Sequence, residues 1–543
     1  MAEMKNPDES ESKAKGAGSH DGLSESKNNT RNKPALFLLV MSLFWGVFLV
    51  ALDQTIVGTA VPSITTEFKA LDDIVWYGSG YLLTVTAFQP TFGKIYLFMN
   101  AKIVFLACVL IFEVGSILCA AAPSSAVFII GRAVAGAGAA GLFQGALAII
   151  TRTISLKNRP LCISIVTSTF AVSVAIGPVI GGAFSDRVTW RWCFWINVPI
   201  GAVVLVLIFF ILHLPAGTKD SSFSSLSLSQ RLWKLDPFGA LFIISAVVAI
   251  LLALQWGGQS KPWNSSTVIG LLVIFPVLVA LFALTQWKLG ADATLPLALL
   301  RQRSILTGGL FCFFFSMPTY LFGYYIPIYF QAAKGATAIE SGTRYLALAL
   351  PQIVAVVLSG SLVTILGFYV PFMILGTAFA LVGSGLFLML DLQTSTALWA
   401  IFLVVCGVGT GFSINLPYTI VQVVLPETHV PTGNAMFQFL FQLGGALSLS
   451  IGQTIFLSQL KASAEHLTPS IPYYVLTQAG AYNLRGIAGS QAIYDLIRHV
   501  YMNALHDTYI FPVVVTGVAL LTTFALEHKN IKKISEEREQ AQI

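Results

Sequence analysis

The sequence predicts an all-α polytopic membrane protein with fourteen transmembrane helices. Its 543 residues are 56% apolar and only 10% charged, whereas a soluble domain carries about 25% charged residues. Apolar runs long enough to cross a bilayer, about 20 residues each, recur along the chain. This composition excludes a water-soluble enzyme or a disordered scaffold, because the chain lacks the polar side chains that such a surface needs. The net charge of +6 requires no nucleic acid to explain it.

The fourteen predicted spans fall into blocks of six, two and six. Gly and Pro inside them are common in membrane helices and do not argue against them. The spans are 36–62, 74–93, 103–121, 126–149, 161–184 and 192–212, then 238–256 and 267–287, then 306–330, 343–366, 370–390, 398–420, 434–457 and 509–526.

Polar segments divide the chain into domains. Lys and Arg favour cytoplasmic termini, because the predicted inner flanks hold sixteen of them and the short outer loops six. The expected parts are a disordered cytoplasmic tail (1–35), a first block of six spans (36–212), a cytoplasmic linker (213–237), two inserted spans (238–287), a last block of six spans (288–526) with a long extracellular loop at about 458–508, and a cytoplasmic tail (527–543).

Motifs for other energy sources and for enzyme chemistry are missing from the sequence. It has no phosphate loop of the form G-x-x-x-x-G-K-[ST] and no H-E-x-x-H zinc motif. The six cysteines lie in or beside apolar runs without a C-x-x-C pair, so we expect buried apolar residues rather than disulfides or a metal site. Secondary transport and a pore remain as the possible functions. We expect no cofactor and no enzyme activity.

Three ionisable residues lie deep inside the apolar runs, where a charge costs about 2.5–3.5 kcal/mol. Asp53 and Arg132 lie at depths that agree to about 5 Å, from the rise of a helix, so they can pair. The pair either fixes helix packing or lets Arg132 tune proton binding by a carboxylate. Glu113 lies about 15 Å deep, and it either couples to protons or stays protonated and bonds a neighbouring helix.

Uncharged polar residues in the apolar runs are candidates for a substrate cavity. Amides and phenols among apolar walls suit a moderately hydrophobic organic molecule. Hydrogen bonds between helices are the alternative for each residue. The candidates are Gln89, Tyr320, Tyr324, Asn415, Tyr418, Gln438 and Gln442.

Four motifs occur in order on successive spans. They read LDQTIVGTAVP at 52–62, GRAVAGAGAAG at 131–141, GPVIGG at 177–182 and WRWCFWINVPIG at 190–201. Together they resemble the major facilitator superfamily, and within it the fourteen-span drug:proton antiporters, especially fungal multidrug and toxin efflux pumps. The resemblance covers residues 36–526.

This resemblance implies a major facilitator fold, with two six-helix bundles around a central cavity and two inserted helices. It assigns the acid of the fourteen-span group to Asp53 and the proton-coupling arginine to Arg132. The hinge of the antiporter motif falls on Gly177, Pro178, Gly181 and Gly182. The sequence departs from the family at Leu97, where an acid is usual, and at Ser173, where the antiporter motif usually has glycine.

The implied function is a secondary active transporter that exports a moderately hydrophobic toxin, metabolite or drug in exchange for protons by alternating access. Its expected partners are the lipid bilayer, a small organic substrate and protons, with no nucleic acid. A monomer in the plasma membrane is expected, with a vacuolar or vesicle membrane as the alternative. Proton-coupled uptake, for example of an iron chelate, a membrane-embedded transferase and a channel are the other hypotheses.

Overall fold

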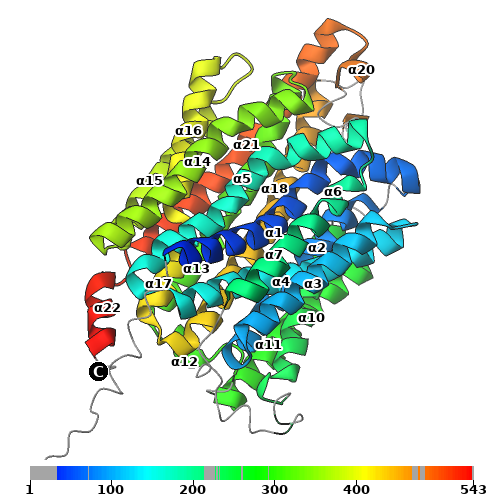
Figure 1. Cartoon of the computed structure of the whole chain (residues 1–543). Helices are drawn as coiled ribbons and strands as arrows, with labels where there is room; N and C mark the ends of the chain where they lie inside the picture. The colour runs from blue at the N-terminus through cyan, green and yellow to red at the C-terminus, as the bar shows by residue number, and fades with distance from the viewer. Residues whose placement is uncertain are drawn as a thin grey trace, which may run out of the picture.

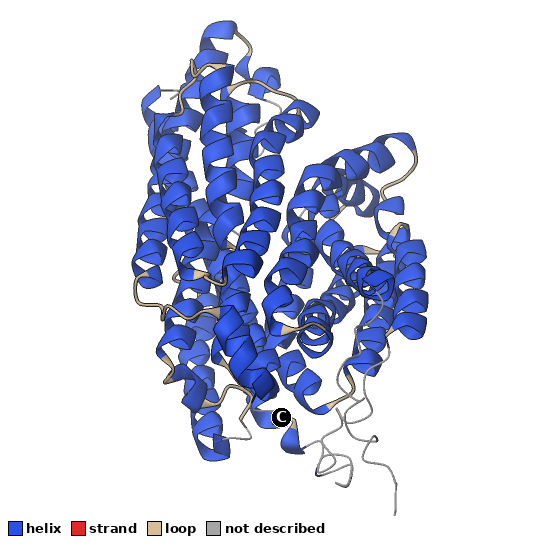
Figure 2. Cartoon of the chain, turned by 60° about the vertical axis from the view of Figure 1, so that its left-hand side comes forward, coloured by secondary structure: helices blue, strands red, loops and turns tan. Residues whose placement is uncertain are grey.

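The computed structural model describes residues 33–70, 73–212, 233–257, 261–290, 293–467 and 484–540, with isolated positions at 227, 230 and 475–476. Long helices dominate this part of the chain, and they lie side by side in two groups (Figures 1 and 2). The prediction of an all-α membrane fold is confirmed. Thirteen helices of the described ranges are long and apolar enough to cross a membrane.

The N-terminal group holds the first six predicted spans. Its last span is interrupted at Ile196, between a short helix and a longer one. The elements are α1 (Lys33–Phe68), α2 (Ile74–Phe98), α3 (Ala101–Ala120), α4 (Ser125–Thr153), η2 (Leu156–Asn158), α5 (Arg159–Arg187), α6 (Trp192–Trp195) and α7 (Asn197–Ile211).

The remaining elements are the other spans in the predicted order, the shorter helices beside them and the C-terminal helix α22. They are α10 (Pro237–Trp256), α11 (Ser266–Leu289), α12 (Leu297–Leu300), α13 (Arg303–Ile328), η5 (Tyr329–Ala333), α14 (Ala338–Leu366), α15 (Val370–Leu386), η6 (Phe387–Met389), α16 (Thr396–Ser413), α17 (Leu416–Val424), η7 (Glu427–His429), α18 (Val430–Leu467), α20 (Leu484–Ala488), α21 (Gln491–Thr523) and α22 (Ile531–Gln540).

Fourteen spans were expected, and the one missing from the thirteen strongly apolar helices is the second, α2. Its 25 residues give a length of about 37 Å at 1.5 Å per residue, enough to cross the hydrocarbon layer. Its sequence carries Thr, Ser, Gln and Lys side chains among the apolar ones. These polar groups are sheltered, because α2 packs between α4, α10 and α18. The predicted count of fourteen is therefore close.

The two halves repeat one packing pattern. In the N-terminal half α1 packs on α5, α2 on α4 and α3 on α4; in the C-terminal half α13 packs on α18, α14 on α16 and α15 on α16. The halves meet where α5 packs on α14 and α2 packs on α18. This repetition fits two related bundles that face each other across a shared interface.

Helix α10 of the inserted pair packs along α2 at the outside of the N-terminal bundle, and α11 packs on α10. Only 11% of the most apolar 18-residue stretch of α11 is buried within the protein. Val273, Val277 and Trp287 are more than half exposed. A soluble protein does not expose an apolar face of this extent. Lipid therefore covers α11.

Two predicted boundaries differ from the structure. The first helix begins at Lys33 rather than after residue 35, and residues 1–32 of the expected tail lie outside the described residues. The loop predicted at about 458–508 is largely helical, because α18 continues to Leu467 and α21 begins at Gln491. Both helices extend beyond the hydrocarbon layer, where a hydropathy window no longer detects them. The C-terminal tail contains a helix, α22.

The glycines of the α4 motif bring α4 close to two neighbours. A Cβ at Gly138 would collide with the backbone of Phe112 on α3, and a Cβ at Gly136 would collide with Tyr81 on α2. Small residues let membrane helices approach closely and gain van der Waals contact. The motif therefore packs the centre of the N-terminal bundle and fixes where Arg132, on the same helix, lies.

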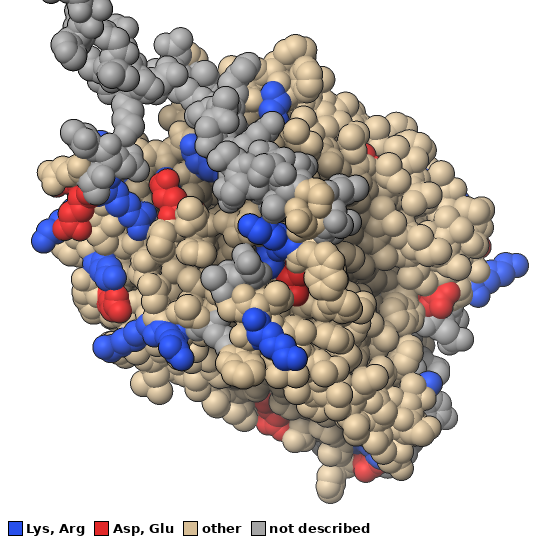
Figure 3. Space-filling view, turned by 90° about the horizontal axis from the view of Figure 1, so that it is seen from below, with Lys and Arg blue, Asp and Glu red and all other residues tan. Residues whose placement is uncertain are grey.

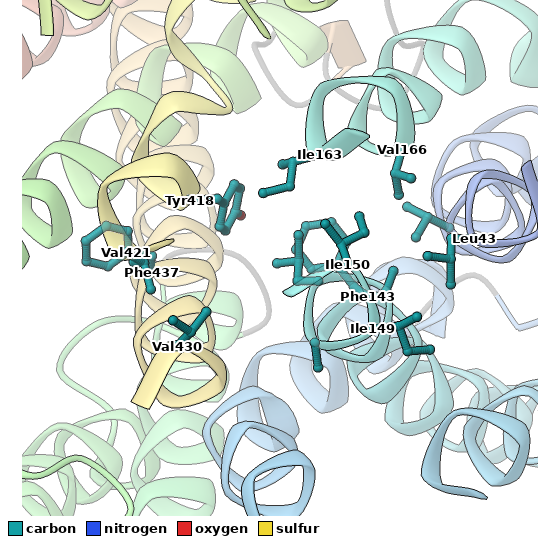
Figure 4. Close-up of a cluster of buried hydrophobic side chains, with 14 of the residues drawn as sticks. Leu43, Phe143, Ile149, Ile150, Ile163, Val166, Tyr418, Val421, Val430 and Phe437 are labelled. Carbon is teal, nitrogen blue, oxygen red and sulfur yellow. The ribbon is translucent and has the colours of Figure 1, made fainter. Parts of the chain in front are cut away.

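An apolar cluster joins the two halves near the end of the molecule that carries α22. Figure 4 shows Tyr418 of α17 pointing toward Phe143 and Ile150 of α4, with Ile163 of α5 beside them. The rings of Phe143 and Tyr418 lie 5.9 Å apart at their centroids. This contact closes the interface between the bundles at that end, which the positive-inside rule predicts to be cytoplasmic. Lys and Arg side chains lie across this face (Figure 3).

Candidate functional site

A cavity of about 490 Å³ lies between the two bundles, next to the apolar cluster, whose Phe143 and Tyr418 line it. Helices α1, α2, α4 and α5 line one side, and α13, α14, α17 and α18 line the other. Arg132 is the one charged side chain among the described residues that line it, and eight of the lining residues are aromatic. The volume is in the range of about 300–1,000 Å³ that small organic ligands occupy.

Six of the seven predicted cavity residues line this cavity. They are Tyr320, Tyr324, Asn415, Tyr418, Gln438 and Gln442. The prediction for Gln89 is wrong, because Gln89 lies inside the N-terminal bundle, where Gln144 Nε2 donates to its Oε1 at 2.7 Å. The amide of Gln89 faces α4 rather than the interface between the halves, so it joins two helices.

The cavity also has lining residues that were not predicted from the sequence. Phe143, Phe170, Tyr345 and Phe441 add aromatic surface, and Gln352 adds a further amide. Aromatic side chains are frequent throughout the chain, so composition gives no signal for the ones that face the cavity. The rotation of each helix about its own axis decides this, and that rotation follows from packing against its neighbours.

Asp53 of α1 and Arg132 of α4 form a buried ion pair at the cavity wall, as their depths predict. Arg132 Nη1 donates to Asp53 Oδ2, and each side chain is 1% exposed. The guanidinium also donates from Nε to the carbonyl of Tyr77 at 2.9 Å and lies over the Tyr81 ring at 4.5 Å. These contacts hold the cation in place, and only Arg132 of the pair reaches the cavity.

Asn197 is a third member of this polar centre that the sequence analysis did not identify. Its Nδ2 lies 3.4 Å from Asp53 Oδ1 and 3.2 Å from Ser116 Oγ on α3. The side chain is fully buried at the start of α7. Its position in the WRWCFWINVPIG motif was the available signal, because a buried amide in a membrane needs a partner.

Glu113 lies apart from the cavity, on the α7 side of α3. Its side chain is 7% exposed, and neither carboxyl oxygen has a hydrogen-bond partner among the described residues. A Cβ at Gly201 of α7 would collide with this carboxyl. Because Ser116 follows Glu113 by three residues on one helix face, a polar track leads from Asp53 through Asn197 and Ser116 toward Glu113.

The antiporter motif packs α5 on α1. A Cβ at Gly177 would collide with Thr55, and one at Gly181 with Thr59, whereas Gly182 faces open space. Thr55 Oγ1 lies 3.0 Å from the backbone carbonyl of Ser173, a contact that does not depend on the side chain at this position. Pro178 lines the cavity. The motif therefore sets the closeness of α1 and α5 beside the site, and its role as a hinge stays a prediction.

Polar contacts also join the two halves at the end of the molecule that carries α22, near the apolar cluster. Arg159 Nη2 of α5 lies 2.5 Å from Glu427 Oε1 of η7, and its Nη1 lies 3.2 Å from Gln422 Oε1 of α17. Thr151 of α4 bonds the same amide at 3.0–3.2 Å. We call Thr151, Arg159, Gln422 and Glu427 the inner latch. It holds the bundles together at the end that carries α22.

The C-terminal helix α22 adds to this closure. Arg538 donates to the carbonyls of Gln422, Val423 and Leu425 at the end of α17, at 3.2, 3.0 and 2.9 Å. These carbonyls are the ones that a helix end leaves without intrahelical partners. The expected cytoplasmic tail at 527–543 thus contains a helix that binds the inner end of the C-terminal bundle.

The opposite end of the N-terminal bundle is fixed by the WRW segment. Trp190 Nε1 donates to Glu67 Oε2 at 2.6 Å, and Arg191 Nη2 lies 2.7 Å from Glu67 Oε1. Burial raises the pKa of Glu67, but these two hydrogen bonds outweigh burial, and the pKa falls below its usual value. Arg191 also donates to the carbonyls of Ala120 and Ala122 at the end of α3. The motif therefore ties α1, α3 and α6 together.

Two facing helical bundles, a lipid-facing helix pair and a central cavity beside a buried ion pair define a multi-pass membrane transporter. The sequence model of the Major Facilitator Superfamily matches residues 43–449. The chain belongs to this superfamily, and it is a transporter rather than an enzyme.

Curated relatives match most of the chain. The MFS-type efflux pump MFS1 of Trichophyton rubrum is 39% identical over 528 residues, which cover 95% of this chain and 98% of that protein. The aspyridones efflux protein of Neocamarosporium betae is 41% identical over 507 residues, 93% of this chain and 89% of the relative. The efflux pump aflT of Aspergillus parasiticus is 36% identical over 499 residues, 92% and 96% of the two chains.

Solved structures share the fold. The proton:xylose symporter XylE covers 93% of this chain and 99% of its own, with a TM-score of 0.60 and 12% sequence identity. The human organic anion transporter MFSD10 covers 88% and 99%, with a TM-score of 0.55 and 15% identity. At these identities the likeness concerns the fold alone.

Proposed function

We propose that the chain exports a moderately hydrophobic small organic molecule in exchange for protons, as a monomer in the plasma membrane. The observation that carries this proposal is the buried Asp53–Arg132 pair at the wall of a cavity that is otherwise uncharged and rich in aromatic side chains. The names of the relatives, which are efflux pumps, support the direction of transport.

Proton binding at Asp53 changes the balance at the cavity wall. With Asp53 ionised, its charge cancels that of Arg132, and the wall is neutral overall. Protonation removes one side of a charge-assisted hydrogen bond and leaves Arg132 with a net charge next to the cargo. A neutral, apolar cargo is held less well beside an uncompensated cation, so proton uptake and cargo release accompany each other.

The driving force is sufficient for protective export. One proton gains about 2.3 kcal/mol per 100 mV and about 1.36 kcal/mol per pH unit. Exchange of one proton for one neutral molecule across 100 mV and one pH unit therefore supplies about 3.7 kcal/mol, a concentration ratio of several hundredfold.

Proteoliposomes with an imposed pH difference test this proposal with Nile red, a neutral fluorescent dye. We expect wild-type protein to move the dye against its gradient in the direction opposite to the protons. Asp53→Asn should lose pH-driven movement and keep exchange of dye for dye, because exchange needs no net proton transfer. Asp391→Asn is the matched control, since Asp391 is an exposed loop residue. Full pH-driven movement in Asp53→Asn would contradict the assignment of Asp53.

A further inference from the structure

The hydrogen-bonding groups on the C-terminal wall of the cavity are arranged as pairs of a phenol and an amide. Tyr418 donates its hydroxyl proton to Gln438 Oε1, and Tyr320 donates its proton to Gln442 Oε1. A phenol has one proton, so both phenol donors are already in use. The NH2 groups of Gln438 and Gln442 donate to none of the described residues. Each pair therefore presents amide N–H donors to a ligand.

A third amide on the same wall lacks an acceptor. Asn415 lies at the break between α16 and α17, 3% exposed, and its Nδ2 has no hydrogen-bond partner among the described residues. A buried donor without an acceptor costs about 1–3 kcal/mol, and such a group in a native protein requires an explanation. A ligand that brings an acceptor to the cavity would remove this cost.

The charge of the wall selects against ionised cargo. Among the described lining residues there is no Asp or Glu, and Arg132 is the single charged group. A cationic cargo would therefore enter a dry site with no counter-charge on the wall, which is costly. An anionic cargo would bind better when Asp53 is protonated, and this would couple cargo and proton in the same direction. The antiport proposed above thus requires a neutral cargo.

The apolar part of the wall is aromatic. Phe143 and Phe170 come from the N-terminal half, and Phe441 and the two paired tyrosines come from the C-terminal half. Aromatic rings gain about 0.5–1.5 kcal/mol from stacked or edge-to-face contact beyond the burial of area. Flat ring systems make such contacts on both faces, so the walls favour a planar molecule.

We infer that the cargo is a neutral, planar aromatic molecule that carries carbonyl oxygens, held by ring contacts and by the amides of Asn415, Gln438 and Gln442. Carbonyl oxygens accept hydrogen bonds without adding a donor that needs its own partner. This inference rests on the proposed export function for the exclusion of anions. The arrangement of the amides and rings supports the rest independently.

A matched pair of ligands tests the inference without a proton gradient. Anthracene and 9,10-anthraquinone have the same three-ring skeleton, and only the second carries carbonyl oxygens. Binding of each radiolabelled compound is measured by equilibrium dialysis against nanodiscs that hold the full chain, with empty nanodiscs subtracted for partition into lipid. We expect wild-type protein to bind anthraquinone at least tenfold more tightly than anthracene, about 1.4 kcal/mol. Ethidium, a planar cation, should bind more weakly than anthraquinone.

Variants locate the effect. The double variant Asn415→Leu and Gln442→Leu should reduce the preference for anthraquinone to threefold or less. Gln89→Leu, which removes a buried amide outside the cavity, should keep the full preference. Equal binding of the two compounds by the wild-type protein, absence of anthraquinone binding or a preference for ethidium would overturn the inference, even if the double variant does not fold. Anthraquinone selectivity without pH-driven Nile red transport would refute antiport and leave the ligand class standing.

Discussion

The two halves of the protein repeat one packing pattern but face the cavity with different chemistry. The N-terminal half places a buried ion pair at the wall, Asp53 with Arg132, and supports it with Asn197. The C-terminal half places uncharged pairs there, Tyr320 with Gln442 and Tyr418 with Gln438. A buried charge is sensitive to protonation, whereas a neutral amide–phenol pair is not. In the proposed mechanism one half therefore responds to protons while the other recognises cargo.

This division predicts that changes in the two halves differ in kind as well as in size. A change in the N-terminal centre should alter how transport depends on pH. A change of the same number of atoms in the C-terminal wall should alter the affinity for cargo and leave the pH dependence as it is. Three variants test the comparison, in order of falling effect.

Arg132→Leu should have the largest effect. It leaves Asp53 buried without its cation, and removing one partner of a buried pair costs about 3–5 kcal/mol. We expect a lower melting temperature in detergent and transport of Nile red reduced more than a hundredfold. The double variant with Asp53→Leu removes both charges, so it should recover much of the stability but none of the pH-driven transport. If the double variant still transports with the pH gradient, the N-terminal centre is not the proton site.

Arg159→Ala should have an intermediate effect, because it removes the contact between halves rather than a group at the cavity. The inner latch loses its bonds to Glu427 and Gln422, and hydrogen bonds of charged groups contribute about 1.5–3 kcal/mol. We expect the inner end to open more often. Cys162, which is 9% exposed one turn along α5, should then react several times faster with N-ethylmaleimide.

The controls for the latch are two further variants. Glu427→Gln should change the labelling rate less than Arg159→Ala does, because Glu427 is half exposed and water screens such a pair. Cys162→Ser should abolish the change. An unchanged labelling rate in Arg159→Ala would show that the apolar contact of Phe143 with Tyr418 closes the inner end by itself.

Tyr418→Phe should have the smallest effect. It removes the hydroxyl that holds Gln438, and a neutral hydrogen bond contributes about 0.5–1.5 kcal/mol net. We expect the KM for Nile red to rise by no more than about tenfold, with an unchanged pH profile of transport. A shifted pH profile in this variant would mean that the C-terminal wall takes part in proton coupling, and the division between the halves would fail.

The fold class was predictable from the sequence alone because the bilayer constrains it strongly. Backbone polar groups in lipid must be satisfied within the helix, so each apolar run of sufficient length reports a span regardless of its neighbours. The pairing of Asp53 with Arg132 was predictable for a related reason. A charge in the membrane is costly and needs a partner, and the chain offers few at matching depth.

Residues that face the cavity were predictable only in part. Gln89 and Gln442 look alike in sequence, since each is an amide in an apolar run, yet one joins two helices and the other lines the cavity. The contact of Asn197 with Asp53 joins residues that are far apart along the chain, and so do the contacts of the inner latch. Hydropathy along a chain is a local property that fixes where helices cross the membrane. The rotation of each helix and the contacts between the halves follow from packing, so only the tertiary structure decided which polar groups meet.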